Sequence, residues 1–259
     1  MVMGTFPFGE PVQALERVDR EPKEIFILGV YASAVHARWR GPDGKELIKA
    51  LAVASEPYIF WRGEGTQSIV DRIKLPPGAG QLEPASAVFN GPSGLALDRL
   101  YLLPLARARS QAWLSDLVPH SCVNGQQQAA IDRSYRPRMA RLGLPVPSVP
   151  SVPLQLANQA RQEAIAAELV ESRARILVLL GDKPIQWFSS RWLPKYRRLA
   201  DFGTDADRYG RLVETTVADA RVALLPLAHP RQVARLGKSS DRWYELHQNW
   251  LSQRAPTLI

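Results

Sequence analysis

The sequence predicts an α/β protein, a three-layer α/β/α sandwich around a central, mostly parallel four-stranded sheet. Short, continuous apolar runs bounded by breaking residues are typical of strands that are buried on both faces. Segments with helical periodicity lie between these runs, and strands that alternate with helices predict a parallel sheet covered on both sides. The composition, 46% hydrophobic and 22% charged, is that of a globular chain with a sizeable core.

The expected strands are the apolar runs of the sequence. Three runs are short, strongly apolar and flanked by breakers, and a fourth is less apolar. The four are Glu24–Tyr31, Arg175–Gly181, Arg221–Ala228 and, as the less apolar one, Gln111–Val118. Ligand sites in such sheets lie beyond the carboxyl ends of the strands, so we expect the functional residues to follow these runs.

The expected helices lie between the strands. Leu156–Arg173 carries apolar residues at helical spacing, and Asp182, two residues before a proline, marks the start of a second helix. The alternation continues along the chain, so we predict one domain over residues 1–259. Residues 40–65 are predicted to be an insertion, with β character around Tyr58–Trp61.

Charge and cysteine content limit the classes of partner and cofactor. The 33 Lys and Arg residues exceed the 25 Asp and Glu residues by eight, which favours a polyanionic partner, although many basic proteins bind no nucleic acid. The single cysteine, Cys122, excludes an intrachain disulfide and a Cys-rich metal site. No signal peptide or membrane-spanning run is apparent. We therefore expect a cytoplasmic monomer with no metal, organic cofactor or membrane partner.

Five short motifs occur in a fixed order along the chain. They are Gly29–Ser33 (GVYAS), Phe89–Gly94 (FNGPSG), Trp113–Asp116 (WLSD), the strand that ends at Gly181, and His229 with the proline after it. This order and spacing resemble the uracil-DNA glycosylase superfamily. The resemblance implies a uracil-DNA glycosylase-like fold with DNA as the partner. It also implies an enzyme that flips a base out of DNA and hydrolyses its N-glycosidic bond to leave an abasic site.

The resemblance assigns roles to two of these residues. Phe89 matches the aromatic on which the flipped base stacks, a contact worth about 1–3 kcal/mol. His229 matches the histidine that donates a hydrogen bond to the departing base, and loss of such a donor costs about 2.7–4 kcal/mol in the barrier. The ordinary alternatives are a core position for Phe89 and a helix-capping role for His229.

The resemblance also implies which residues line the base pocket, and here the sequence departs from the family pattern. The implied pocket residues are Gly29, Tyr31, Ser33 and Asn90. Where the family usually carries an acid or amide that orients water, this chain has valine and tyrosine, which cannot act as a carboxylate base. Glu56 or Asp98 could replace that acid, or a dissociated sugar cation could capture water unaided. The ordinary alternatives are a solvated surface position for Glu56 and a structural role for Asp98.

Asp116 stands where the family reads uracil with an asparagine. An ionised carboxylate can only accept hydrogen bonds, which suits the amino group of cytosine and opposes O4 of uracil. If burial raises its pKa, the neutral acid could also donate to N3 of cytosine. Ser33, in place of the aromatic that walls the C5 side of the base, leaves room for a modified cytosine. Examples are the glucosylated hydroxymethylcytosines of some phages, and some members that resemble this pattern act in antiphage defence.

The segment after His229 is where relatives place a loop that enters the DNA minor groove. Val233 or Leu236 could fill the space of the flipped base, and three cations could meet phosphates, Arg231, Arg235 and Lys238. The ordinary alternative is the start of an amphipathic helix.

The function predicted first is therefore a glycosylase that acts on a cytosine-type base, with Asp116, His229 and Glu56 as the candidate catalytic residues. Uracil excision for DNA repair is one alternative, and a DNA-binding relative that has lost catalysis is another. A nucleotide-dependent enzyme is disfavoured, because the sequence has neither a G-x-G-x-x-G motif nor a P-loop.

Overall fold

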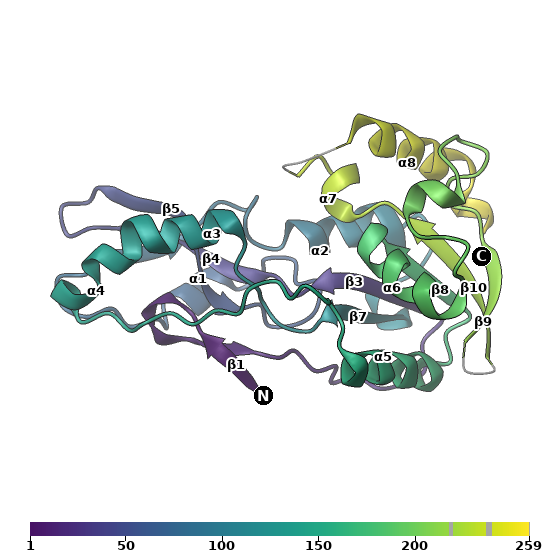
Figure 1. Cartoon of the computed structure of the whole chain (residues 1–259). Helices are drawn as coiled ribbons and strands as arrows, with labels where there is room; N and C mark the ends of the chain where they lie inside the picture. The colour runs from purple at the N-terminus through teal and green to yellow at the C-terminus, as the bar shows by residue number, and fades with distance from the viewer. Residues whose placement is uncertain (218–219, 237–239, 259) are drawn as a thin grey trace. The chain divides into compact units, whose positions relative to one another are not determined.

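The computed structural model describes residues 1–217, 220–236 and 240–258 (Figure 1). The chain divides into two compact units, each assembled from separate stretches. The first unit comprises Met1–Glu16, Tyr31–Gly94 and Pro119–Leu154, and the second comprises Arg17–Val30, Leu95–Val118 and Gln155–Ile259. Residues 40–65 belong to the first unit. The single domain with an insertion stays a prediction.

A five-stranded, mostly parallel sheet forms the centre of the second unit (Figure 1). Its strand order is β7-β3-β8-β10-β9, for β7 (Ala112–Val118), β3 (Ile25–Tyr31), β8 (Ile176–Leu180), β10 (Ala220–Leu227) and β9 (Val213–Val217). β8 pairs in parallel with β3 on one side and with β10 on the other. The N–H of Glu24, just before β3, donates to the carbonyl of Gln111, just before β7 (3.0 Å), so these two strands start side by side and run in the same direction.

The four predicted strands are all present in this sheet, and the α/β class is confirmed. Their apolar runs are continuous because the strands are buried: all of β7 is buried, as are Leu177–Leu180 of β8. The fifth strand, β9, was not predicted. It pairs antiparallel with β10 at the sheet edge, and its sequence, VETTV, alternates between exposed and less exposed positions, so it lacks a continuous apolar run.

Helices of the second unit connect and cover these strands. They are α5 (Gln159–Ser172), α6 (Asp182–Trp192), α7 (Pro230–Val233) and α8 (Asp241–Gln253), with the π-helical turn η2 (Asp98–Leu102) and the 3₁₀ turns η3 (Arg109–Gln111), η5 (Leu199–Phe202) and η6 (Ala255–Thr257). α5 starts three residues later than expected because the side chain of Asn158 caps it, accepting from the N–H of Arg161 (2.9 Å). α6 starts at Asp182, as the sequence predicts.

The first unit contains a smaller antiparallel sheet with the order β5-β4-β6. Its strands are β4 (Ala34–Arg40), β5 (Glu46–Ser55) and β6 (Gln81–Pro84), and a separate pair is formed by β1 (Val2–Thr5) and β2 (Pro11–Gln13). Its helical elements are η1 (Pro7–Gly9), α1 (Thr66–Val70), α3 (Gly125–Ala130), η4 (Ile131–Tyr135) and α4 (Arg136–Leu142), and α2 (Pro92–Leu97) begins in this unit. Phe8, Trp39 and Tyr135 pack together in its core, with ring centroids 5.2–5.8 Å apart.

The expectation of β structure around Tyr58–Trp61 is wrong. These residues form turns after β5, while Ile59, Phe60 and Trp61 are nonetheless buried. Their apolar character therefore reflects burial in a turn and not a strand. Among the helices of the described residues, none combines the length and apolarity that a bilayer crossing requires.

Candidate active site

His229 follows β10 at the carboxyl edge of the sheet and caps the short helix α7. Its Nδ1 accepts a hydrogen bond from the N–H of Arg231 (3.2 Å). Because Nδ1 is the acceptor, the proton of the neutral ring lies on Nε2, which is left as a donor. Burial, followed by the nearby charge of Arg231, lowers the pKa of His229 to about 4. At neutral pH the partly exposed ring is therefore an uncharged Nε2–H donor.

Gly181, the residue between β8 and α6, lies directly against His229. A Cβ atom at position 181 would be 3.0 Å from the Cβ of His229, closer than ordinary contacts allow. Its backbone also has φ +85° and ψ 179°, a conformation that is essentially restricted to glycine. Because position 181 is a glycine, His229 can lie directly against the carboxyl end of β8.

Two buried tyrosines hold the peptide that precedes His229. The hydroxyl of Tyr101 donates to the carbonyl of Ala228 (2.6 Å), and the N–H of Ala228 donates to the hydroxyl oxygen of Tyr209 (3.0 Å). Burial raises the pKa of both phenols, so each stays protonated. Both hydrogen-bonding groups of Ala228 are therefore fixed by buried side chains.

The hydrogen bonds around Tyr209 continue to His247 on α8. The Nε2 of His247 lies 2.9 Å from the carbonyl of Leu100 and must donate to it, so Nδ1 is the acceptor for the Tyr209 hydroxyl (2.9 Å). Burial lowers the pKa of His247 to about 4, which keeps the ring neutral. These hydrogen bonds form a series from the Ala228 N–H through Tyr209 and His247 to the carbonyl of Leu100. Only one placement of the protons gives every bond in the series one donor and one acceptor.

Asp116 lies near the end of β7 and is 3% exposed. Its neighbours Trp113 and Ser115 contact α5, so Asp116 points to the opposite face of the sheet. Among the described residues, none donates a hydrogen bond to its carboxylate. Burial raises the pKa of Asp116 to about 7, and the lowering effect of Arg161 is smaller. Near neutral pH this side chain can therefore act as either a carboxylic acid or a carboxylate.

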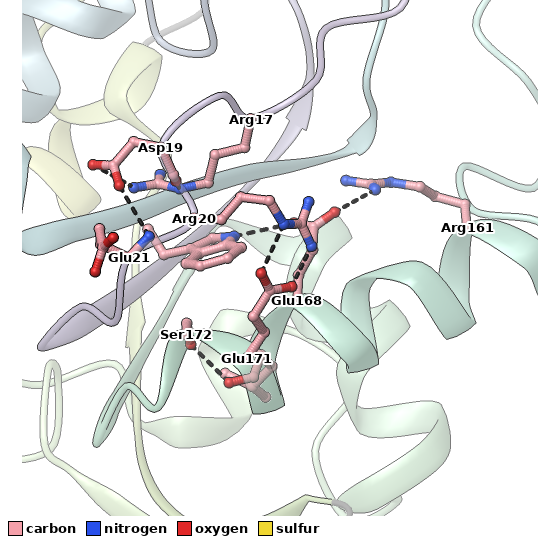
Figure 2. A network of polar contacts seen from close by, with 10 residues as sticks. Arg17, Asp19, Arg20, Glu21, Arg161, Glu168, Glu171 and Ser172 are labelled. Carbon is pink, nitrogen blue, oxygen red and sulfur yellow. Dashed lines mark hydrogen bonds and ion pairs between the residues drawn. The ribbon is translucent and has the colours of Figure 1, made fainter.

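A polar network behind β7 fixes the backbone of Asp116, and Figure 2 shows the Arg161–Glu168 ion pair of this network. Arg161 donates to the Asp116 carbonyl through Nη2 (2.7 Å) and Nε (3.2 Å), and its Nη2 also bonds Ser115 Oγ (2.8 Å). Glu168 pairs with Arg161 (2.7 Å) and accepts from the indole of Trp113 (3.3 Å). Every member of this network has a structural partner, so we assign it to the support of β7.

Asp116 and His229 belong to the same unit, on strands three positions apart in the sheet. With neighbouring strands roughly 4.8 Å apart, about 14 Å separates β7 from β10. Phe89 belongs to the other unit, so its convergence with these two residues stays a prediction.

In the first unit, Phe89 is partly exposed and its ring lies against His36 of β4, with centroids 6.3 Å apart. Asn90 beside it is buried, and its amide is engaged by the protein. Its Oδ1 accepts from the N–H of His36 (2.8 Å), and its Nδ2 donates to the carbonyls of His36 and Ala85 (3.0 and 3.1 Å). The amide of Asn90 thus holds the loop against β4, and both of its N–H groups have acceptors there.

The glycines of the Phe89–Gly94 motif permit a close approach of two backbone segments. A Cβ at Gly91 would lie 2.1 Å from backbone atoms of Arg62 and Gly63, and Gly91 has φ +71°. A Cβ at Gly94 would lie 2.3 Å from the carbonyl oxygens of Phe60 and Trp61. This packing is one physical reason for the G-x-x-G spacing.

The remaining residues proposed for the pocket lie near the ends of strands. Gly29 is buried in β3, and Tyr31, which ends β3, is partly exposed. Ser33 is partly exposed, and its carbonyl accepts from the hydroxyl of Ser121. Glu56 directly follows β5 and is 3% exposed, so the alternative of a solvated surface glutamate is wrong. Asp98 forms an ion pair with Arg109 (2.6 Å).

The predicted DNA-binding segment divides into parts with different surroundings. Arg231 is exposed at the start of α7, whereas Arg235 lies over the ring of Tyr244 at 4.0 Å. Lys238 lies outside the described residues. Val233, the last residue of α7, is 1% exposed, so the suggestion that it enters DNA is wrong. Leu236 is partly exposed.

Sequence reasoning missed Tyr101, Tyr209 and His247. The available signal was weak: His247 lies on the apolar side of α8, between Leu246 and Trp250, where a polar residue needs buried partners. Among the described residues, no three His, Cys, Asp or Glu side chains gather as a metal site requires.

The comparisons with known proteins assign no family. A scan against protein-family models gives no match, and a search of curated proteins gives no significant similarity.

Proposed function

We propose that the protein is a DNA glycosylase of the uracil-DNA glycosylase type, with a three-layer fold, that removes a flipped cytosine-type base and leaves an abasic site. The observation that carries the proposal is the state of His229. A neutral imidazole whose Nε2–H has no acceptor among the described residues stands at the carboxyl edge of a parallel sheet, where such sheets bind ligands.

The chemistry follows from the bond that is broken. Cleavage of the bond between C1′ and the pyrimidine nitrogen leaves the electron pair on the base and cationic character on the sugar. The Nε2–H of His229 would stabilise the negative charge on the base as it develops. Water then adds to C1′ and loses a proton. Glu56 belongs to the first unit, so its assignment as the residue that orients this water stays a prediction.

Asp116 supports the choice of base. A neutral carboxylic acid offers one donor and one acceptor side by side, which matches N3 and the amino group of cytosine. With a pKa of about 7, Asp116 has such a proton available near neutral pH.

The test is incubation with oligonucleotides that contain uracil, cytosine, hydroxymethylcytosine or glucosylated hydroxymethylcytosine, followed by alkaline cleavage at abasic sites. We expect cleavage at a cytosine-type base. His229→Ala should slow it roughly 10²–10³-fold, the usual effect of losing one such donor. His120→Ala, the matched control in the other unit, should leave the rate within about twofold, an ordinary effect for a residue outside the reacting centre.

Other outcomes would favour the alternatives. Cleavage at uracil alone would indicate repair-type uracil excision. Salt-sensitive DNA binding without abasic sites in any of the four DNAs would indicate a relative that binds DNA and has lost catalysis. If Asp116→Asn left the base preference unchanged, the assignment of Asp116 as the base reader would be wrong.

A further inference from the structure

A basic loop follows α6 in the second unit. We define it as Leu193–Arg198, the segment between α6 and η5. Together with Arg191 it carries Lys195, Arg197 and Arg198, all exposed, and no acidic residue occurs from position 191 to 198. A concentration of cations on one short segment is the usual footprint of a polyanion-binding surface, although many such runs are only solvated.

The end of the basic loop is tied to the sheet edge that carries His229. The N–H of Leu199, directly after Arg198, donates to Oδ1 of Asp182 (2.8 Å). Asp182 is the first residue of α6 and follows Gly181, which lies against His229. The loop therefore leaves the far end of α6 and returns to its start, next to the candidate active site.

The backbone of the basic loop is fixed by its own contacts. Asp201 accepts from the N–H groups of Arg197 (2.7 Å) and Arg198 (3.1 Å), and Tyr196 stacks on Phe202 with centroids 4.1 Å apart. Because Asp201 is engaged by the backbone and by the side chain of Arg198 (3.4 Å), it does not pair with the side chain of Arg197.

Two cations of the loop remain available for a partner. Lys195 and Arg197 form no ion pair with a residue in the described part of the chain, and Lys195 only approaches the ring of Tyr196 (5.4 Å). Arg198 pairs with Asp201, and Arg191 bonds Gln162 (2.9 Å). A rigid backbone that presents two uncompensated cations beside a base-binding edge is suited to phosphate contacts.

We propose that the basic loop binds the DNA backbone, with Lys195 and Arg197 contacting phosphates that flank the base at His229. The choice of DNA as the polyanion rests on the proposed function. The position of the loop is independent of that function, because it follows from the Leu199–Asp182 hydrogen bond and the Gly181–His229 contact.

The test compares two double variants that each remove two positive charges. Lys195→Gln with Arg197→Gln changes the basic loop. The matched control, Arg175→Gln with Arg221→Gln, changes two exposed arginines near the starts of β8 and β10, at the opposite edge of the same sheet. Binding is measured by fluorescence anisotropy with a labelled 20-base-pair duplex of A·T pairs only, at several salt concentrations. This duplex contains no base that the proposed enzyme removes.

Each lost phosphate contact lowers the slope of log K against log salt by about 0.9. We therefore expect the loop variant to lose about 1.8 from the slope and to bind roughly 60-fold more weakly at 0.1 M salt than the wild type. The control variant should stay within about threefold of the wild type, since only long-range attraction changes. A third variant, Arg197→Lys, keeps the charge and should bind like the wild type.

Equal losses in the two double variants, or no loss in the loop variant, would overturn the inference. An unaltered thermal unfolding midpoint establishes that the loop variant is folded. Because binding is read without catalysis, the two proposals can fail separately. A loop-specific loss of binding with no abasic sites in any DNA would support the loop assignment and reject the glycosylase, and the reverse result would reject the loop alone.

Discussion

Replacement of Asp116 by asparagine should make the protein more stable, by an amount that grows with pH. The carboxyl group is 3% exposed and accepts no hydrogen bond from a described residue, so its ionised form is costly in the folded state. Burial raises its pKa from 3.8 to about 7. Asparagine has nearly the same shape and carries no charge at any pH, so it removes this cost.

The magnitude follows from the two pKa values. Between pH 4 and pH 7 the folded protein holds a proton on Asp116 that the unfolded chain has lost, so the free energy of unfolding falls as pH rises. The full effect is about 3 pKa units, or roughly 4 kcal/mol, and it is reached above pH 7. Between pH 5 and pH 8 the wild type should lose roughly 2.5 kcal/mol through this group alone.

The assay is urea unfolding of the wild type and the Asp116→Asn variant at pH 5, 6, 7 and 8. The stability difference between them should grow by roughly 2.5 kcal/mol in favour of the variant across this range. Glu163→Gln, which removes an exposed carboxyl of α5, is the control and should show no comparable trend. A difference that is constant with pH would show that Asp116 is ionised throughout, and the argument for a proton shared with cytosine would fail.

Three further results are expected. Tyr209→Phe leaves the Ala228 N–H and the Nδ1 of His247 unpaired. It should lower the free energy of unfolding in urea by about 2–6 kcal/mol, from 1–3 kcal/mol for each of these two buried groups. Tyr244→Phe, whose hydroxyl has no partner among the described residues, is its control, and equal effects would refute the network. Gly181→Ala should lower the free energy of unfolding by about 1–3 kcal/mol through backbone strain, and it should slow base release because the new methyl group displaces His229. Gly125→Ala is the control: no atom lies within 4 Å of the added Cβ, so neither the stability nor the rate should change. Burial raises the pKa of Cys122 to about 11, so its labelling by a thiol reagent should rise about tenfold per pH unit from pH 7 to 10, and a plateau near pH 9 would contradict this environment.

Much of the fold could be predicted because burial leaves a direct mark on the sequence. β3, β8 and β10 are continuous apolar runs, and the start of α6 is marked by Asp182 before a proline. β9 could not be predicted in the same way, since an edge strand exposes alternate residues and carries polar side chains there. Ile59–Trp61 show the converse, an apolar run that is buried without forming a strand.

The candidate site was predictable in part. His229 was found by its position after a predicted strand and by the resemblance, and Asp116 by the resemblance alone. The structure adds that burial lowers the pKa of His229 to about 4 and raises the pKa of Asp116 to about 7. Tyr209 and His247 were not found, because their hydrogen bonds join residues 38 positions apart and depend on tertiary packing. Asn90 shows how a motif residue can have a structural task, since its amide bonds the backbone of β4.

The most direct test of the account is a single-turnover measurement of free base released from one DNA. A duplex with a single glucosylated hydroxymethylcytosine, and a second with hydroxymethylcytosine, would be incubated with excess protein, and the released base identified by mass spectrometry. We predict that a free cytosine-type base appears at the same rate as abasic sites, and that His229→Ala slows both roughly 10²–10³-fold. Release at an unchanged rate in His229→Ala would contradict it, as would the absence of any released base from these DNAs and from plain cytosine and uracil DNA.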